Sequence, residues 1–504
     1  MHFTQALLPF SLIAAASASV IPARDSAATQ KIKWGPCGFN GTLPIVCGNL
    51  SVPLDYTDKS SKATLTLNVI KAPTAHKPSR GSILFNFGGP GGDGQQNLAS
   101  IASAMQAMTG GYHDLISFDP RGTGNTLTFS CYNDTLTRTV STLNLKQELV
   151  NSSDTAVGRT WAAGKVLSDT CLGRLKGNSS LVGTAFVARD MMQIVDALGE
   201  DGKLRYWGVS YGTVLGATVA SMFPDRMDKV ILDGVQNPHE YYRGYEIETF
   251  TDTDATFEGF LSGCVKSPKN CALARGNATT ASLKKSMAKL FDSIKYQPVQ
   301  FGQSLIDYTF LKSHIFSTLY YPSSYPTLAA LLDSLVTGNV TAQADLWTTT
   351  LAAPAPIANE ALAGIKCGDK STRASSLSAI TPIIDHQLQS IKWFGDVAGT
   401  TILQCTRWGM AAKERYQGNF QAKTKNPLLI IGNTYDPVTP LVSARNVSAG
   451  FEGSVVLQQN SYGHMSIAQP SNCTINYIQN YFLNGTLPNP GTVCEPNNPL
   501  FYKA

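Results

Sequence analysis

Charge, basic runs and long hydrophobic runs are all scarce in this sequence. Charged residues make up 15% of the 504 residues, the formal net charge is +5, and no run holds five or more basic residues. We therefore expect no nucleic-acid partner, because such partners require a concentrated basic stripe. No segment is long and apolar enough to cross the roughly 30 Å hydrocarbon layer of a membrane, so we expect no membrane partner either. The 43% hydrophobic content indicates a globular protein whose length suits two structural units or one large domain with an insertion.

The Cys-x-x-Cys pattern of many zinc sites is missing as well, and we expect no metal and no cofactor. The sequence has ten cysteines, and an even count without that pattern suits disulfides in an oxidising compartment. Sequence alone does not prove a connectivity. The simplest pairing is sequential: Cys37–Cys47, Cys131–Cys171, Cys264–Cys271, Cys367–Cys405 and Cys473–Cys494.

The N-terminus carries the pattern of a signal peptide. An apolar run of about a dozen residues ends in Ala16-Ser17-Ala18, which offers an A-x-A cleavage site, although His2 replaces the usual Lys or Arg before it. We predict a signal peptide over residues 1–18 and a secreted, extracellular protein. Ten N-x-[ST] acceptors, among them Asn133 and Asn277, fit a glycoprotein.

Short apolar runs that end in turns rich in Gly, Pro and Asp recur along the chain. They alternate with segments of helical spacing, which indicates a parallel sheet covered by helices on both faces. Residues 64–72 instead alternate like a strand with one solvated face. The apolar runs lie in residues 81–94, 114–126, 204–210, 228–235 and 426–440.

Between roughly residues 236 and 395 the pattern becomes largely helical and loses the strand-then-turn form. We interpret this stretch as a cap inserted between two halves of the sheet domain. The predicted organisation is a signal peptide (1–18), the first part of an α/β core (19–235), a mainly helical cap (236–395) and the second part of the core (396–504).

Ser210 lies in the pattern Gly-x-Ser-x-Gly, where an apolar strand meets a helix. Such a turn projects a serine above the carboxyl edge of the sheet, and Gly208 and Gly212 leave room for it. The helix N-terminus also favours negative charge beside the serine. The alternative is a strand–helix turn with an idle serine.

A nucleophilic serine needs a base that is oriented by a carboxylate. His464 follows the last strand pattern, where the order Ser…Asp…His of doubly wound hydrolases requires the base. Two carboxylates stand at strand ends, Asp436 and Asp233. We favour Asp436, which lies one strand–helix–strand unit before His464, and expect Asp233 to cap the turn into the inserted segment.

Acyl transfer also needs two N–H groups for the developing oxyanion. One is expected from Tyr211, after the nucleophile, and the other from Gly89 in the glycine-rich loop "FGGPGG". That loop could instead bind phosphate, but it lacks the Gly-Lys-[Ser/Thr] ending of a Walker loop.

These motifs together give a family resemblance. The stretches "FNFGGPGGDG", "FDPRGTGNT", "WGVSYGTVLGATVASMFPDRMDKVILDGV", "NPLLIIGNTYDPVTPLVSARN" and "SYGHM" resemble the secreted tripeptidyl-aminopeptidase branch of the α/β-hydrolases. The C-terminal stretch "SNCTINYIQNYFLNGTLPNPGTVCEP", with its two cysteines, resembles the characteristic C-terminal segment of that branch. The resemblance implies an α/β-hydrolase fold, Ser210, Asp436 and His464 as the catalytic triad, and cleavage near a free N-terminus. It also implies cap carboxylates that bind the substrate ammonium, for which the sequence offers Glu246, Glu248, Asp252, Asp254 and Glu258.

One departure concerns Phe87, which stands where the related proline iminopeptidases usually have His. This puts strict proline specificity in doubt. We expect a serine exopeptidase that acts on peptides with a free N-terminus through an acyl-enzyme. The alternatives are an esterase or lactonase with the same machinery and an inactive hydrolase fold that serves as a binding module.

Overall fold

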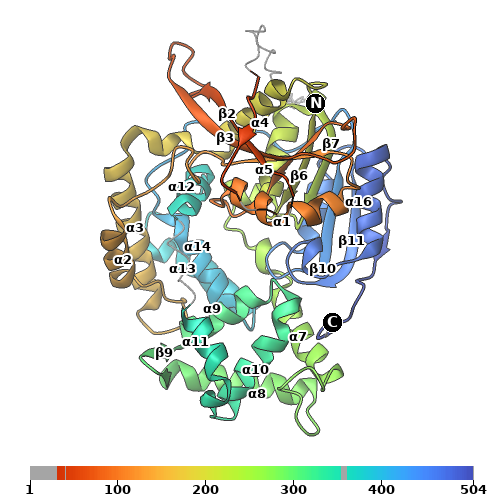
Figure 1. Cartoon of the computed structure of the whole chain (residues 1–504). Coiled ribbons are helices and arrows are strands. Elements are labelled where there is room, and N and C mark those ends of the chain that lie inside the picture. The colour runs from red at the N-terminus through yellow and green to blue at the C-terminus, as the bar shows by residue number, and fades with distance from the viewer. Residues whose placement is uncertain (1–30, 40, 42, 353–359, 503–504) are drawn as a thin grey trace, which may run out of the picture.

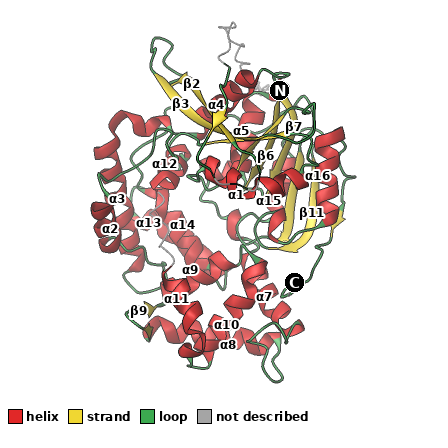
Figure 2. Ribbon diagram, viewed as in Figure 1, coloured by secondary structure: helices red, strands yellow, loops and turns green. Residues whose placement is uncertain are grey.

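A ten-stranded sheet forms the centre of the structure (Figures 1 and 2). Across the sheet the strands are β1 (Gly35–Pro36), β2 (Val46–Pro53), β3 (Thr64–Ala72), β5 (Asp114–Phe118), β4 (Ser82–Asn86), β6 (Leu204–Val209), β7 (Met227–Asp233), β10 (Leu429–Tyr435), β11 (Val455–Tyr462) and β12 (Val493–Cys494). From β5 to β12 all neighbours are parallel, and β1, β2 and β3 add an antiparallel edge. This computed structural model describes residues 31–39, 41, 43–352 and 360–502, so the predicted signal peptide lies outside the described residues.

Helices cover both faces of the sheet, as the alternation of side chains along the strands requires. Ile83 and Phe85 of β4 pack in one core layer with α1 (Gly94–Met108) and α16 (Asn472–Asn484). Leu84, between them, packs in the opposite layer with α4 (Thr184–Leu198), α5 (Tyr211–Met222) and α15 (Leu441–Ser448). Burying each such side chain stabilises the fold by about 1.5–3 kcal/mol. The arrangement confirms the predicted α/β-hydrolase class.

Most of the inserted segment forms a second, mainly helical body with its own core (Figure 1). Phe257, Phe260, Trp347 and Phe394 lie at its centre. A small hairpin, β8 (Val299–Phe301) with β9 (Ser304–Ile306), is the part of it that is not helical or loop. The helices of this body are α7 (Thr253–Lys266), α8 (Thr280–Tyr296), α9 (Tyr308–Thr318), α10 (Tyr325–Val336) and α11 (Ala344–Ala352). In the same segment, α6 (Pro238–Arg243) and α12 (Glu360–Asp369) pack with the sheet core, and α13 (Leu377–Ser390) packs in a separate small cluster.

A further helical pair comes from the first half of the chain. α2 (Thr135–Asn144) and α3 (Ala156–Leu175) follow β5 and lie beside α12, α13 and α14 (Gly395–Thr406), at the left of Figure 1. α14 begins at residue 395, the predicted end of the cap, and the domain boundaries themselves stay a prediction.

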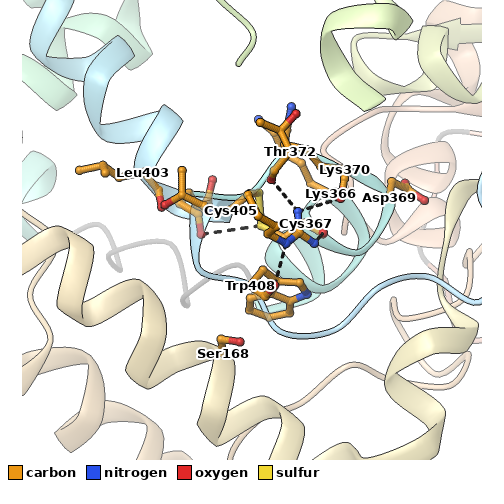
Figure 3. Close-up of a disulfide and its surroundings, with 12 residues drawn as sticks. Ser168, Lys366, Cys367, Asp369, Lys370, Thr372, Leu403, Cys405 and Trp408 are labelled. Carbon is orange, nitrogen blue, oxygen red and sulfur yellow. Dashed lines mark hydrogen bonds between the residues drawn. A yellow bond between two sulfur atoms is a disulfide. The ribbon is translucent and has the colours of Figure 1, made fainter. Parts of the chain in front are cut away.

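The disulfides follow the sequential pairing, the simplest of those that the sequence left open: Cys37–Cys47, Cys131–Cys171, Cys264–Cys271, Cys367–Cys405 and Cys473–Cys494. Cys367–Cys405 joins α12 to α14 (Figure 3). Beside this disulfide, Arg373 donates to the carbonyl oxygens of Cys367 and Trp408, each at 2.7 Å. The disulfide therefore ties α12, within the inserted segment, to α14, where the second part of the core begins. Within the ranges described above, no helix has the length and apolar character to span a membrane.

Candidate active site

Ser210 stands on a sharp turn between β6 and α5. Its φ of 57° and ψ of −126° place it in a region that residues other than glycine rarely adopt, and its backbone N–H donates to the Asp233 carbonyl oxygen at 3.1 Å. The turn leaves Ser210 at the N-terminus of α5, where the unpaired backbone N–H groups favour negative charge.

The glycines around Ser210 are required by close backbone approach. A Cβ atom on Gly212 would lie 2.6 Å from the Asn86 carbonyl oxygen, and one on Gly208 would collide with the Gly212 carbonyl oxygen. A Cβ atom on Gly88 would lie 2.8 Å from Ser210 Cβ. The pentapeptide that the sequence offered therefore has the geometry of a nucleophile-bearing turn.

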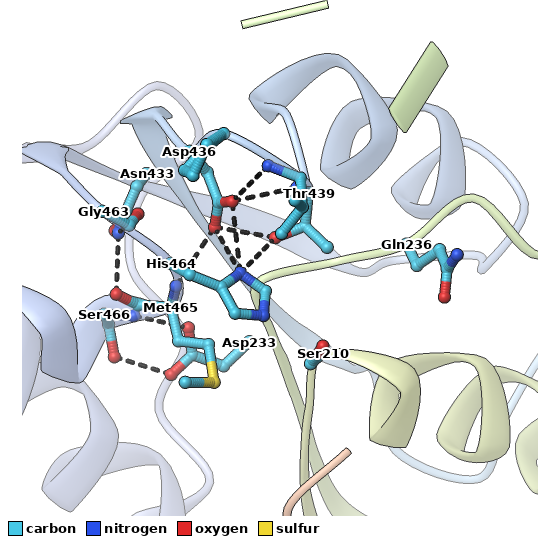
Figure 4. Close-up of polar contacts among 12 residues, drawn as sticks. Ser210, Asp233, Gln236, Asn433, Asp436, Thr439, Gly463, His464, Met465 and Ser466 are labelled. Atoms are coloured by element: carbon cyan, nitrogen blue, oxygen red, sulfur yellow. Dashed lines mark hydrogen bonds and ion pairs between the residues drawn. The ribbon is translucent and has the colours of Figure 1, made fainter. Parts of the chain in front are cut away.

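His464 and Asp436 form a buried hydrogen-bonded pair (Figure 4). His464 Nδ1 lies 2.9 Å from Asp436 Oδ2 and 3.1 Å from Oδ1, and the side chains are 4% and 0% exposed. Because a carboxylate only accepts, Nδ1 carries the proton and Nε2 is left as the basic nitrogen. Burial by itself would raise the pKa of the Asp436 carboxyl, but His464 and the neighbouring donors outweigh it and hold that pKa below its ordinary value.

In Figure 4 the imidazole of His464 lies between the Asp436 carboxylate and Ser210, with Nε2 on the serine side. Among the described residues no hydrogen bond joins Ser210 to His464. Contacts between base and nucleophile commonly tighten only in the substrate complex. The structure thus brings the three predicted triad residues together, with the base–carboxylate contact formed.

The sequence led us to expect that Asp233 caps the turn into the inserted segment, and this expectation is wrong. The Asp233 carboxylate accepts from the Ser466 backbone N–H at 2.9 Å and from Ser466 Oγ at 2.6 Å. Burial raises the pKa of this carboxyl to about 6. The difference arises because the loop after His464 folds back over the end of β7, a contact between segments more than 200 residues apart. Asp233 thus holds the histidine loop without contacting the imidazole.

Two residues that the sequence did not single out also fix the pair. Thr439 donates its hydroxyl to Asp436 Oδ2 at 2.7 Å, and Thr439 Oγ1 lies 3.0 Å from His464 Nδ1. Asn433 Nδ2 donates to the carbonyl oxygens of Gly463 and Met465, at 2.9 and 2.7 Å. The turn sequence after Asp436 could have pointed to Thr439, whereas nothing in the local pattern marks Asn433.

The glycine-rich loop after β4 lies against the nucleophile turn. Gly88 and Gly89 have φ values of +87° and +107°, which favour glycine. The Gly88 N–H donates to Asn86 Oδ1 at 3.1 Å. In the part of the chain that the structure describes, no acceptor is bonded to the backbone N–H of Gly89 or Tyr211. These are the two groups predicted for the oxyanion hole, and their role there stays a prediction.

The five carboxylates predicted to bind the substrate ammonium all lie between residues 246 and 258, near the start of the cap, and most already have protein partners. Glu246 pairs with Lys366 and Lys370, at 3.0 and 3.3 Å, and Glu258 pairs with Lys284 at 2.7 Å. Glu248 accepts from Ser443, Asn446 and Asn237, and Asp254 accepts from the backbone N–H groups of Lys392 and Trp393.

Asp252 differs from the other four. Its carboxylate is half-buried. Burial raises its pKa, and the nearby charge of Asp436 adds to this against the opposing charge of Arg445. Within the described ranges no Lys or Arg forms an ion pair with it. The described residues also contain no group of three or more His, Cys, Asp or Glu side chains that could hold a metal ion.

Two protein families match the chain. The family described as "alpha/beta hydrolase fold" matches residues 82–328, and the family described as "TAP-like protein" matches residues 390–494. The first match holds β4, the nucleophile turn and part of the cap. The second holds Asp436, His464 and the last disulfide.

Several curated proteins are similar over nearly the whole length. The tripeptidyl aminopeptidase of Streptomyces lividans is 27% identical over 501 residues, covering 96% of this chain and 90% of that protein. The serine protease Hip1 of Mycobacterium tuberculosis is 26% identical, covering 92% of this chain and 91% of that protein. Carboxylesterase B of the same species is also 26% identical, covering 89% and 86%.

Solved structures are more distant. A thermophilic esterase from Thermogutta terrifontis is 9% identical with a TM-score of 0.34, covering 86% of this chain and 97% of that one, and the α/β-hydrolase MGS-M2 is 12% identical with a TM-score of 0.35, covering 84% and 96%. The sheet topology, the nucleophile turn, the two family matches and the full-length relatives agree with one another. The chain has the α/β-hydrolase fold of the serine hydrolases, carries a TAP-like C-terminal segment, and is similar over nearly its whole length to tripeptidyl aminopeptidases.

Proposed function

We propose that this protein is a secreted serine exopeptidase that releases short peptides or residues from free N-termini. The observation that carries the proposal is the buried Asp436–His464 pair, whose free Nε2 faces the serine held at the N-terminus of α5. The cap beside this site would restrict access to chain ends. The tripeptidyl aminopeptidases of Streptomyces, similar over 96% of the chain, support the choice of substrate.

The chemistry follows from the roles that the geometry suits. Ser210 Oγ attacks the scissile carbonyl carbon while His464 Nε2 takes its proton, and Asp436 stabilises the imidazolium that forms. The N–H groups of Gly89 and Tyr211 hold the oxyanion, each lowering the barrier by about 3 kcal/mol. His464 then protonates the leaving amine, and a water molecule activated by His464 hydrolyses the acyl-enzyme.

Preference for a free N-terminus requires a carboxylate for the substrate ammonium. We propose that it comes from the set Glu246, Glu248, Asp252, Asp254 and Glu258, all on the segment that enters the cap. Asp252 is favoured within this set, because the other four carboxylates are engaged by lysines, side-chain amides, hydroxyls or backbone N–H groups. An ammonium bound there would replace part of the hydration that burial removes from Asp252.

An esterase is the second candidate function. The triad does not distinguish an ester from an amide, and one full-length relative is named carboxylesterase B. The choice depends on whether binding of the free amine contributes to catalysis.

A panel of substrates tests the proposal. Tripeptides with a free N-terminus and a fluorogenic leaving amine, the same peptides N-acetylated, and simple acyl esters are compared with the wild-type protein and with Ser210→Ala. We expect kcat/KM for the free peptides to exceed that for the acetylated ones by about 100-fold, since a charge-assisted contact is worth up to about 3 kcal/mol. Equal rates on free and acetylated peptides would exclude aminopeptidase action, and cleavage of esters alone would favour the second candidate.

We also propose that the protein acts outside the cell. The five disulfides suit an oxidising compartment. Expression of the full chain in a eukaryotic secretory host should yield protein in the medium that begins at Ser19. Cell-retained protein with residues 1–18 intact would contradict this.

A further inference from the structure

One cap residue, Tyr320, contacts the histidine of the site directly. It lies in the short connection between α9 and α10. Its carbonyl oxygen accepts the His464 backbone N–H at 2.9 Å. Its ring meets the imidazole edge-on, with the ring centroids 4.9 Å apart and the planes at 69°. Both the backbone and the ring of Tyr320 therefore touch the proposed base.

The segment around Tyr320 lies so close to the loop that carries His464 that the residue before His464 must be glycine. Gly463, immediately before His464, has a φ of +90°. A Cβ atom there would lie 2.8 Å from the Tyr320 carbonyl oxygen and 2.5 Å from Pro322 Cδ. The cap thus fits against the histidine loop without room for a side chain.

Tyr320 is in turn anchored in the cap. Its ring packs edge-on against Phe316 of α9, at 5.9 Å between centroids, and Phe316 contacts Phe250 and Phe394 of the cap core. Burial, with the charge of Asp436, holds the pKa of the Tyr320 hydroxyl above its ordinary value, so the phenol stays neutral. A chain of aromatic contacts therefore runs from the cap core to the imidazole.

We propose that Tyr320 is a positioning residue, through which the cap sets the orientation of the His464 ring. Asp436 and Thr439 hold the imidazole at Nδ1 only. With these contacts alone, the ring could still tilt about Nδ1 and turn Nε2 away from Ser210. The edge-on ring of Tyr320 limits the tilt and keeps Nε2 directed toward Ser210. The proposal rests on the proposed role of His464, but not on the choice between peptide and ester.

The hydroxyl is not part of either contact, so the ring and not the phenol oxygen carries the effect. Removing the ring should lower the rate of proton transfer while leaving substrate binding in place. An aromatic pair of this kind is worth about 0.5–1.5 kcal/mol, which corresponds to a loss of about 2- to 13-fold in kcat.

The experiment compares Tyr320→Leu, Tyr320→Ala and Tyr320→Phe with Tyr321→Ala. Tyr321 is the neighbouring residue, is 51% exposed and serves as the matched control. Leucine keeps an apolar side chain in the site, so Tyr320→Leu remains informative if Tyr320→Ala does not fold. For each variant, kcat and KM are measured on a free tripeptide substrate and on a small acyl ester, together with the rate of labelling by a fluorophosphonate.

We expect Tyr320→Leu and Tyr320→Ala to lose several-fold in kcat and in labelling rate, with KM changed less than about twofold. Tyr320→Phe and Tyr321→Ala should stay near wild type. Wild-type kcat in Tyr320→Leu, or a loss equally large in Tyr320→Phe, would overturn the proposal, and so would an effect confined to KM. Ser210→Ala in the same assays separates the proposed function from the proposed role of Tyr320. Activity that survives Ser210→Ala contradicts the proposed function itself. If Ser210→Ala is inactive, wild-type kcat in Tyr320→Leu contradicts the role of Tyr320 alone.

Discussion

Asp233 is the last residue of β7 and Asp436 directly follows the neighbouring β10, yet only Asp436 reaches the imidazole of His464. Asp436 Oδ2 lies 2.9 Å from His464 Nδ1, whereas the Asp233 carboxylate accepts from Ser466, two residues further along the same loop. One carboxylate orients the proposed base and the other holds the loop that carries it. The two groups can therefore be separated by mutation.

Asp436→Asn should cost far more activity than Asp233→Asn. An amide at 436 can donate to Nδ1 and favours the wrong tautomer, so we expect a loss of about 10³- to 10⁴-fold in kcat/KM. Asp233→Asn keeps the shape of the Ser466 contact and should cost less than about tenfold, since it acts through the loop. Steady-state kinetics on one substrate measures both. A larger loss in Asp233→Asn would assign the orienting role to Asp233.

The titration of Asp233 should appear in the pH dependence of stability. Its pKa is about 6 in the folded protein and near 3.8 without the fold, so between these values the native state binds a proton that the unfolded chain releases. This contribution is full below about pH 4 and is lost as the pH rises through about 6. As the pH rises from about 4 to about 6, the free energy of unfolding of wild type should therefore fall by about 3 kcal/mol relative to that of Asp233→Asn, at the usual 1.4 kcal/mol per pKa unit.

Urea unfolding at a series of pH values checks the Asp233 prediction. Asp225→Asn, at an exposed position, is the control and should follow wild type throughout. A difference between wild type and Asp233→Asn that does not vary with pH would show that the carboxyl does not titrate in this range.

Gly88→Ala should impair the site, and Gly92→Ala should not. A Cβ atom on Gly88 would meet Ser210 Cβ and the Val209 carbonyl oxygen, both at 2.8 Å, at a φ of +87°. A Cβ atom on Gly92, four residues on, finds only ordinary contacts at 3.5 Å. We expect at least about a tenfold loss of kcat/KM for Gly88→Ala, because it displaces the nucleophile. Comparable activity in the two variants would mean that the loop does not fix Ser210.

Asp252→Asn tests the proposed recognition of the substrate amine. Losing a charge-assisted contact should raise KM for free tripeptides by about tenfold and leave the hydrolysis of acyl esters unchanged. Asp385→Asn, at an exposed position in the cap, is the matched control. If Asp252→Asn changes KM equally for free peptides and for esters, Asp252 does not bind the substrate amine.

The sheet and the order of its elements could be predicted because they depend on local patterns. Residues 64–72 alternate, and β3 covers the same residues. Four of the five apolar runs contain a whole strand of the central sheet, and the run 228–235 covers all of β7 except its first residue, Met227. Placing Ser210, Asp436 and His464 used the Gly-x-Ser-x-Gly motif, the Ser…Asp…His order of doubly wound hydrolases, and the rule that parallel strands present their carboxyl ends at one edge. The structure brings these three together as that rule implies, and their catalytic roles stay predictions.

Contacts between distant segments could not be predicted in the same way. Tyr320 reaches His464 from an irregular connection 144 residues earlier, and Ser466 reaches Asp233 across the strand edge. Neither contact has a periodicity or a turn signal. The acidic residues between 246 and 258 give another example. The sequence did not reveal that Lys366 and Lys370, more than 100 residues away in the chain, form ion pairs with Glu246.

Covalent labelling identifies the nucleophile, on which the whole proposed mechanism depends. The folded protein is treated with a fluorophosphonate, and the modified peptide is located by mass spectrometry. We predict a single adduct on Ser210, which is absent from Ser210→Ala and forms at least about 100-fold more slowly in His464→Ala. A folded wild-type protein that takes up no adduct, or an adduct on a different serine, would contradict the account.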